Sequence, residues 1–140
     1  MHGILKGLTM VAVLVGLTTA AAAPAKTYTS KPFAGAKANT GTVTATVDNG
    51  KITLKVSDDF QIPDTPAPSW QIVDSKGNTY LLQRLGAKNL GGLAKDRINM
   101  SITLPSYIKD VAKVQIYCSW AEAVLGEATF ATKLMTANAK

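Results

Sequence analysis

The chain has 140 residues, with 15 basic against 9 acidic side chains and a formal net charge of +6. The basic residues are scattered and form no run with interleaved aromatic residues, so we expect no nucleic-acid partner. The only histidine, His2, lies at the very start of the chain. If the first residues are removed, no histidine remains for a catalytic triad, a zinc site or a histidine-ligated haem, and we expect no hydrolase.

Residues 1–23 have the pattern of a signal peptide. His2 and Lys6 give a basic start, residues 10–17 are apolar, and residues 18–25 are rich in small side chains. The apolar run is too short for a transmembrane helix, so we expect an exported protein, periplasmic or extracellular, without a membrane span after cleavage. Removal leaves about 115 residues, enough for one domain. Loss of Lys6 leaves 14 of the 15 basic residues against 9 acidic ones, a net charge of +5.

The first predicted elements are a leader and a hairpin. Residues 24–39 are small and polar, and we expect a flexible leader from which Phe33 anchors onto the domain. Asn49 and Gly50 then fit a two-residue primed turn between two alternating strands in residues 41–57. This turn places Val47 opposite Ile52, Ala45 opposite Leu54, and Val43 opposite Val56, so that all three apolar pairs share one face.

A proline-rich loop is predicted over residues 57–69, because proline lacks the amide donor that a central strand needs. Asp58, Asp59 and Asp64 lie in this loop. Carboxylates suit a hard cation, but aspartate is also a common turn residue, and the spacing matches no known calcium loop, so we favour the turn interpretation. Strands are expected at residues 70–73 and 79–85, joined by a polar turn.

The rest of the chain also predicts strands. A glycine-rich connection at residues 86–97 precedes an alternating strand at residues 98–104, which Pro105 ends. Residues 111–130 predict a strand, a tight or bulged connection and a further strand, followed by a loose tail at residues 133–140. Short strands without a long helix predict an all-β domain over residues 40–132, an antiparallel β-sandwich or partly open barrel of about six to eight strands.

Cys118 is the only cysteine of the chain, so no internal disulfide can form. It shares its parity with Val114 and Ile116, which predicts an inward-facing thiol, and the simplest interpretation is a small buried hydrophobic residue. A redox thiol needs exposure and a neighbouring positive charge, but Lys113 has the opposite parity. Cys118 with Met100 gives too few ligands for a metal site, so no metal is assigned and the cofactor is unknown. Of the carboxylates, Glu122 and Glu127 lie near the cysteine in sequence.

This region resembles the DM-thirteen domain family, which is described as an extracellular electron-transfer domain. The resemblance spans residues 33–130 and rests on an aliphatic pair, an aromatic residue, the cysteine, a second aromatic residue and a glycine eight positions after the cysteine. The positions that carry it are Val114, Ile116, Tyr117, Cys118, Trp120, Gly126 and Ala128. Tyr117 and Ala121 depart from the pattern, in which tryptophan and a large aromatic residue are expected.

Two functions follow as expectations. The resemblance implies an exported redox or electron-transfer module in which Cys118 reacts, flanked by Tyr117 and Trp120. Its partner would be another extracytoplasmic redox protein or a chain that carries the cofactor. The residues alone favour a non-catalytic β-sandwich that binds a partner or the cell envelope through Trp70, Trp120 or the proline-rich loop, with Cys118 buried. The exposure of Cys118 discriminates between them.

Overall fold

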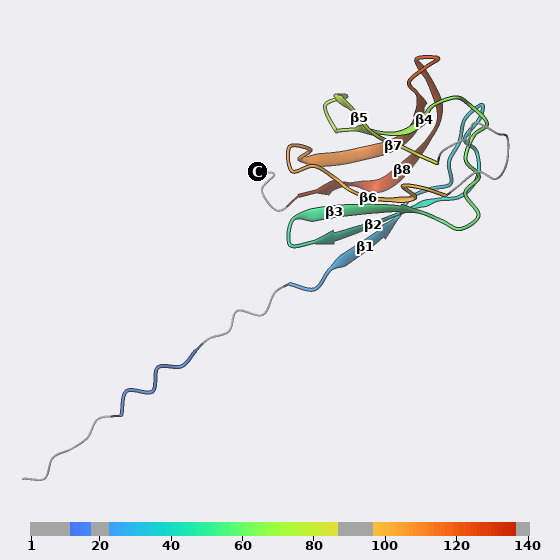
Figure 1. The fold of residues 1–140 in the computed structure, drawn as a ribbon. Coiled ribbons are helices and arrows are strands. Elements are labelled where there is room, and N and C mark those ends of the chain that lie inside the picture. Colours follow the sequence, from blue (N-terminus) through green and yellow to red (C-terminus); the bar gives the residue numbers. More distant parts are fainter. Residues whose placement is uncertain (1–11, 18–22, 87–96, 137–140) are drawn as a thin grey trace, which may run out of the picture.

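The computed structural model of the protein describes residues 12–17, 23–86 and 97–136. Most of the predicted signal peptide, residues 87–96 of the glycine-rich connection predicted over 86–97, and the last four residues lie outside the described residues. The described residues form eight strands and no helix, arranged as two antiparallel four-stranded sheets packed face to face (Figure 1). The fold is therefore an all-β sandwich. Within these residues there is no helix of the length and apolar character needed to cross a bilayer.

Each sheet combines pairs of consecutive strands with one pairing between strands that are distant in the sequence. The first has the order β1-β2-β3-β6 and contains β1 (Lys26–Thr29), β2 (Val43–Asp48), β3 (Lys51–Val56) and β6 (Ser101–Thr103). The second has the order β5-β4-β7-β8 and contains β5 (Thr79–Arg84), β4 (Pro68–Val73), β7 (Asp110–Cys118) and β8 (Ala123–Met135). The β7–β8 hairpin therefore belongs to the second sheet, with β7 as one of its two central strands (Figure 1).

The β2–β3 hairpin has the predicted register. Val43 pairs with Val56, Ala45 with Leu54, and Val47 with Ile52. Asn49 and Gly50 have positive φ angles of 47° and 74°, which a primed turn requires at both of its central positions. Because the turn fixes the pairing and the pairing fixes the buried face, this hairpin was determined by local sequence alone.

The predicted flexible leader over residues 24–39 is wrong for most of its length. Residues 26–29 form β1, which pairs antiparallel with β2. Residues 31–38 then run along the edge of β8, where Ala34 and Glu127 exchange two backbone hydrogen bonds of 2.9 Å. Phe33 is buried, as expected of an anchor, and its ring packs 5.2 Å from that of Phe60. The domain therefore begins near Lys26 rather than at residue 40, because this segment completes both sheets.

Two further strand limits differ from the prediction. The strand expected over residues 98–104 covers only Ser101–Thr103, because Asn99 adopts a positive φ of 56° that interrupts an extended chain. At the other end, β8 continues to Met135, and Leu134 is buried opposite Val111. The predicted loose tail therefore cannot begin at residue 133. The prediction of a bulge between β7 and β8 agrees with the structure, in which the β7–β8 register shifts between Ile116 and Tyr117.

The core lies between the two sheets. The second sheet contributes alternate residues of its central strands, including Trp70 and Ile72 from β4 and Val114 and Ile116 from β7, all without exposed surface. The first sheet faces them with Val43, Ala45, Ile52, Leu54 and Val56. These residues form one hydrophobic core that joins the two sheets, and apolar burial of this kind stabilises a fold by about 25 cal/mol per Å².

Candidate functional site

Cys118 lies at the end of β7, on the face that points into the sandwich. In the register of the sheet it stands between Pro68 of β4 and Ala123 of β8. Its side chain has no exposed surface, so the predicted inward orientation is confirmed. The position is at the rim of the core rather than at its centre, because β7 ends here and the chain turns back into β8.

The sulfur of Cys118 is surrounded by backbone donors. The amide of Ala121 donates a hydrogen bond to Sγ at 3.4 Å, within the turn that follows β7. This amide lowers the pKa of the thiol below its ordinary value, burial opposes it, and the amides of Ala67 and Trp120 lower the pKa further. The environment therefore favours the thiolate electrostatically while denying it contact with solvent. A reactive thiol needs both a stabilised thiolate and access to solvent, so the full burial of Cys118 makes it unreactive in this conformation.

The proline-rich loop covers the thiol. Ser119 donates its backbone amide to the carbonyl of Ala67 at 3.2 Å, which ties the β7–β8 turn to this loop. The hydroxyl oxygen of Thr65 is buried and near enough to lower the pKa of the Cys118 thiol, but it makes no hydrogen bond of good geometry. The guanidinium of Arg84, on β5, donates to the carbonyl of Pro66 and holds the loop from its other side.

The aromatic residues predicted to flank Cys118 do not gather around the sulfur. Tyr117 precedes it on β7 and therefore points to the opposite face of the sheet, level with Ser69 and Val124. Trp120 lies in the β7–β8 turn with 76% of its side chain exposed. Trp70, a candidate contact residue, is fully buried, and its indole nitrogen donates to the carbonyl of Asn99 at 2.7 Å. Of the two tryptophans, only Trp120 can meet a partner.

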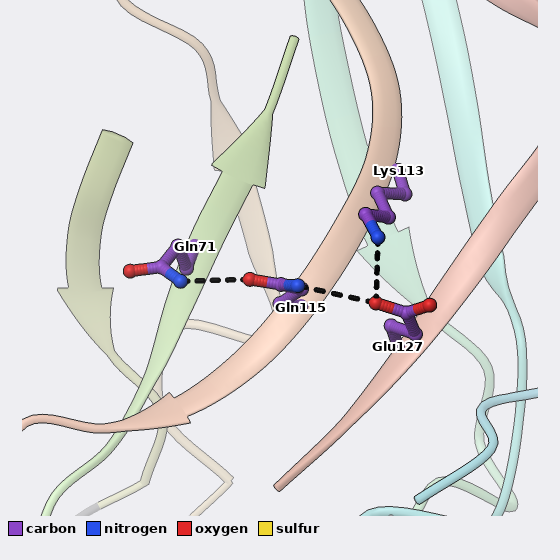
Figure 2. Close-up of polar contacts among 4 residues, drawn as sticks. All are labelled: Gln71, Lys113, Gln115 and Glu127. Atoms are coloured by element: carbon purple, nitrogen blue, oxygen red, sulfur yellow. Dashed lines mark hydrogen bonds and ion pairs between the residues drawn. The ribbon is translucent and has the colours of Figure 1, made fainter. Parts of the chain in front are cut away.

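A polar row crosses the outer face of the second sheet (Figure 2). Gln71 of β4 donates to the side-chain oxygen of Gln115 of β7 at 2.7 Å, and Gln115 donates to Glu127 of β8 at 3.1 Å. Lys113 completes the row with an ion pair of 3.0 Å to the same carboxylate oxygen. The hydrogen bond from Gln115, and then the contact with Lys113, lowers the pKa of Glu127. Every member thus has a partner, which is typical of a structural network.

The three aspartates of the proline-rich loop do not all line one pocket. Asp58 and Asp59 lie in the turn after β3 and line a shallow open pocket of about 540 Å³, whereas Asp64 does not line it. Asp59 accepts a hydrogen bond from the hydroxyl of Ser57, and Arg97 donates to the carbonyl of Phe60 at 2.9 Å in the same pocket. In the described part of the chain, no three metal-ligating side chains come together. Asp59 thus makes a contact typical of a turn residue.

No family model, curated protein or solved structure matches this chain. The geometry therefore carries the functional argument. It also reveals residues that the sequence analysis missed: Thr65 beside the sulfur, and Gln71 and Gln115 in the polar row. Ala121 was noted only as a departure from the family pattern, and the structure shows that its amide donates to the sulfur. The alternation of the two glutamines with buried neighbours signals their outward face, but nothing in the sequence signals that Thr65 lies close to Cys118.

Proposed function

We propose that the protein is exported and acts as a non-catalytic binding module in which Cys118 has a structural role. One observation carries this proposal: the Cys118 side chain has no exposed surface. A redox or nucleophilic thiol must reach its partner, and a sulfur enclosed by the proline-rich loop and the β7–β8 turn does not. The sulfur instead accepts the Ala121 amide and so shapes the turn that follows β7.

The β7–β8 turn is the surface best suited to binding. Trp120 exposes a large, amphipathic side chain there, and Val124 nearby is 46% exposed. Tryptophan is enriched among the residues that carry binding energy, since its ring buries a large area and loses little conformational entropy. Export rests on the signal-peptide pattern of residues 1–23, whose removal would leave the domain from β1 onward intact.

A thiol titration of the purified mature protein tests the structural role of Cys118. We expect no labelling within minutes in the native state, one equivalent after denaturation, and a colourless protein. A matched control is a variant with an added exposed cysteine, Ser119→Cys, which should label at once at one equivalent while Cys118 stays protected. Rapid native labelling of the wild-type protein, or an absorption band that is lost in Cys118→Ser, would overturn the proposal.

A second candidate, an electron-transfer module, is favoured by the donors around Sγ. The amides of Ala121, Ala67 and Trp120 lower the thiol pKa, as in sites that stabilise a thiolate. The resemblance to the DM-thirteen family points the same way. This function requires the proline-rich loop to open, and it requires a second redox group from another chain. Labelling whose rate rises with pH near neutrality, without global unfolding, would support it; protection that is lost only on global unfolding would exclude it.

A further inference from the structure

The turn between β7 and β8 is an exposed and largely apolar projection. Residues 119–124, which comprise this turn and the first two residues of β8, are all exposed, and they contain Trp120, Val124, two alanines and a single charge at Glu122. Figure 1 shows this hairpin end, in dark orange, standing clear of the two sheets. Exposed turns are usually built from glycine, proline, asparagine, aspartate and serine, so a turn with this composition is not explained by turn chemistry. We call residues 119–124 the hairpin tip.

The hairpin tip is held in one conformation by contacts at its base. The Ala121 amide is bonded to Sγ of Cys118, and the Ser119 amide is bonded to the carbonyl of Ala67. Glu122 adopts a positive φ of 52°, which closes the turn. A ligand that meets this tip therefore pays little conformational entropy for ordering it, and Trp120 is presented to solvent rather than folded back on the sheet.

The chemistry of the tip fits a lipid surface better than a protein surface. A stable protein interface covers about 800 Å² on each partner, which one tryptophan and a few small residues do not supply. Tryptophan is enriched at membrane–water interfaces, where its ring is buried and its N–H group stays hydrated. The net charge of +6 for the chain, or +5 without Lys6, attracts anionic lipid.

We propose that the hairpin tip docks the protein onto anionic membranes by inserting Trp120 into the lipid interface. The proposal rests on the proposed function of the protein as a binding module and names the partner of that module. Insertion of one aromatic residue supplies the apolar contribution, and the scattered basic residues supply long-range attraction. Two such weak contributions together give reversible, salt-sensitive binding.

Vesicle binding of the mature protein tests this proposal. The probes are extruded vesicles of phosphatidylcholine with and without phosphatidylglycerol, read by cosedimentation and by tryptophan emission. Trp70 is buried and hydrogen-bonded, so a change in emission reports on Trp120. We expect a blue shift and cosedimentation with anionic vesicles, both weakened by salt. Trp120→Ala should bind about tenfold or more weakly, since a fully buried aromatic side chain contributes at least that factor.

Tyr107→Ala is the matched control, because Tyr107 is also aromatic and 61% exposed but lies outside the hairpin tip. It should bind vesicles like the wild type, and circular dichroism should show that both variants are folded. The proposal is overturned if the wild-type protein neither shifts nor sediments with anionic vesicles, or if Trp120→Ala binds equally well. Rapid native labelling of Cys118 would instead overturn the structural role of the thiol and leave the vesicle result standing.

Discussion

The backbone amide of Ala121 donates to the sulfur of Cys118 at 3.4 Å, so that the one cysteine of the chain organises the turn that presents Trp120. Cys118 is buried while its neighbours in the turn are exposed, and the sulfur is thus the link between the core and the hairpin tip. The small, polarizable thiol suits this position, because it fills apolar space and still accepts a hydrogen bond from a backbone amide.

Replacing Cys118 by alanine should loosen the turn without unfolding the domain. The Ala121 amide loses its acceptor, and the void beside Ala67 and Thr65 costs packing. We expect a lower midpoint of thermal unfolding and faster hydrogen exchange at the Ala121 amide. The Leu54 amide, in the opposite sheet, is the internal reference. Its hydrogen exchange should change only as far as the free energy of global unfolding changes. Unchanged exchange at Ala121 would show that the sulfur does not hold the turn.

Gly126→Ala should be among the most damaging single-methyl additions in the domain. A Cβ atom at Gly126 would lie 2.0 Å from the backbone carbonyl oxygen of Ala38, which cannot move without separating residues 31–38 from β8. We expect a loss of about 3 kcal/mol or more in the free energy of unfolding, measured by urea denaturation. Gly77→Ala is the control: it has a positive φ of 85° but open space, so it should cost only about 1 kcal/mol. Equal losses would contradict the close approach.

Gly126 and Ala38 also show why part of the fold escaped prediction. The β2–β3 hairpin was predictable because the Asn49–Gly50 turn and the alternation of apolar residues specify the same register. Residues 31–38 carry no such pattern. Their small side chains suggest a loose leader, yet small size is what lets this backbone lie against Gly126. That fit is a tertiary property, and composition cannot distinguish it from flexibility.

The candidate site, too, has one part that the sequence predicts and one part that it does not. Alternation along β7 correctly placed Cys118 inward and Lys113 outward, because strand parity is a local property. The exposure of Trp120 and the burial of Trp70 depend on which strand lies at the core and which residues fall in a turn. The approach of Thr65 to the sulfur depends on how the proline-rich loop folds over the rim, and no periodic signal describes such a loop.

Truncation of Phe33 tests whether the leader belongs to the domain. Phe33 is 3% exposed and its ring packs at a tilt against that of Phe60, so Phe33→Ala should cost about 3–5 kcal/mol in the free energy of unfolding. Phe33→Leu keeps most of the apolar volume and should cost clearly less. Limited proteolysis should cut Phe33→Ala, but not the wild-type protein, within residues 26–39. An alanine variant as stable as the wild type would mean that this segment is not anchored.

The polar row of Figure 2 makes a prediction about pH. The pKa of Glu127 is lowered first by Gln115 and then by Lys113, relative to an ordinary value of 4.5. A carboxylate whose pKa is depressed on folding stabilises the native state above its unfolded pKa, and this contribution is lost as the pH falls through the folded pKa. We therefore expect Gln115→Ala and Lys113→Ala each to raise the Glu127 pKa toward this ordinary value, as measured by carboxylate NMR titration.

Stability measurements on the same variants give the second half of this test. Gln115→Ala should cost about 1–3 kcal/mol at neutral pH, since it removes two hydrogen bonds from the sheet face. The free energy of unfolding of this variant should also fall less as the pH is lowered below 4.5, because less of the Glu127 pKa shift remains. Lys113→Ala should cost less stability at neutral pH, as expected for a partly exposed ion pair. A Glu127 pKa that stays unchanged in both variants would show that neither contact stabilises the charged carboxylate.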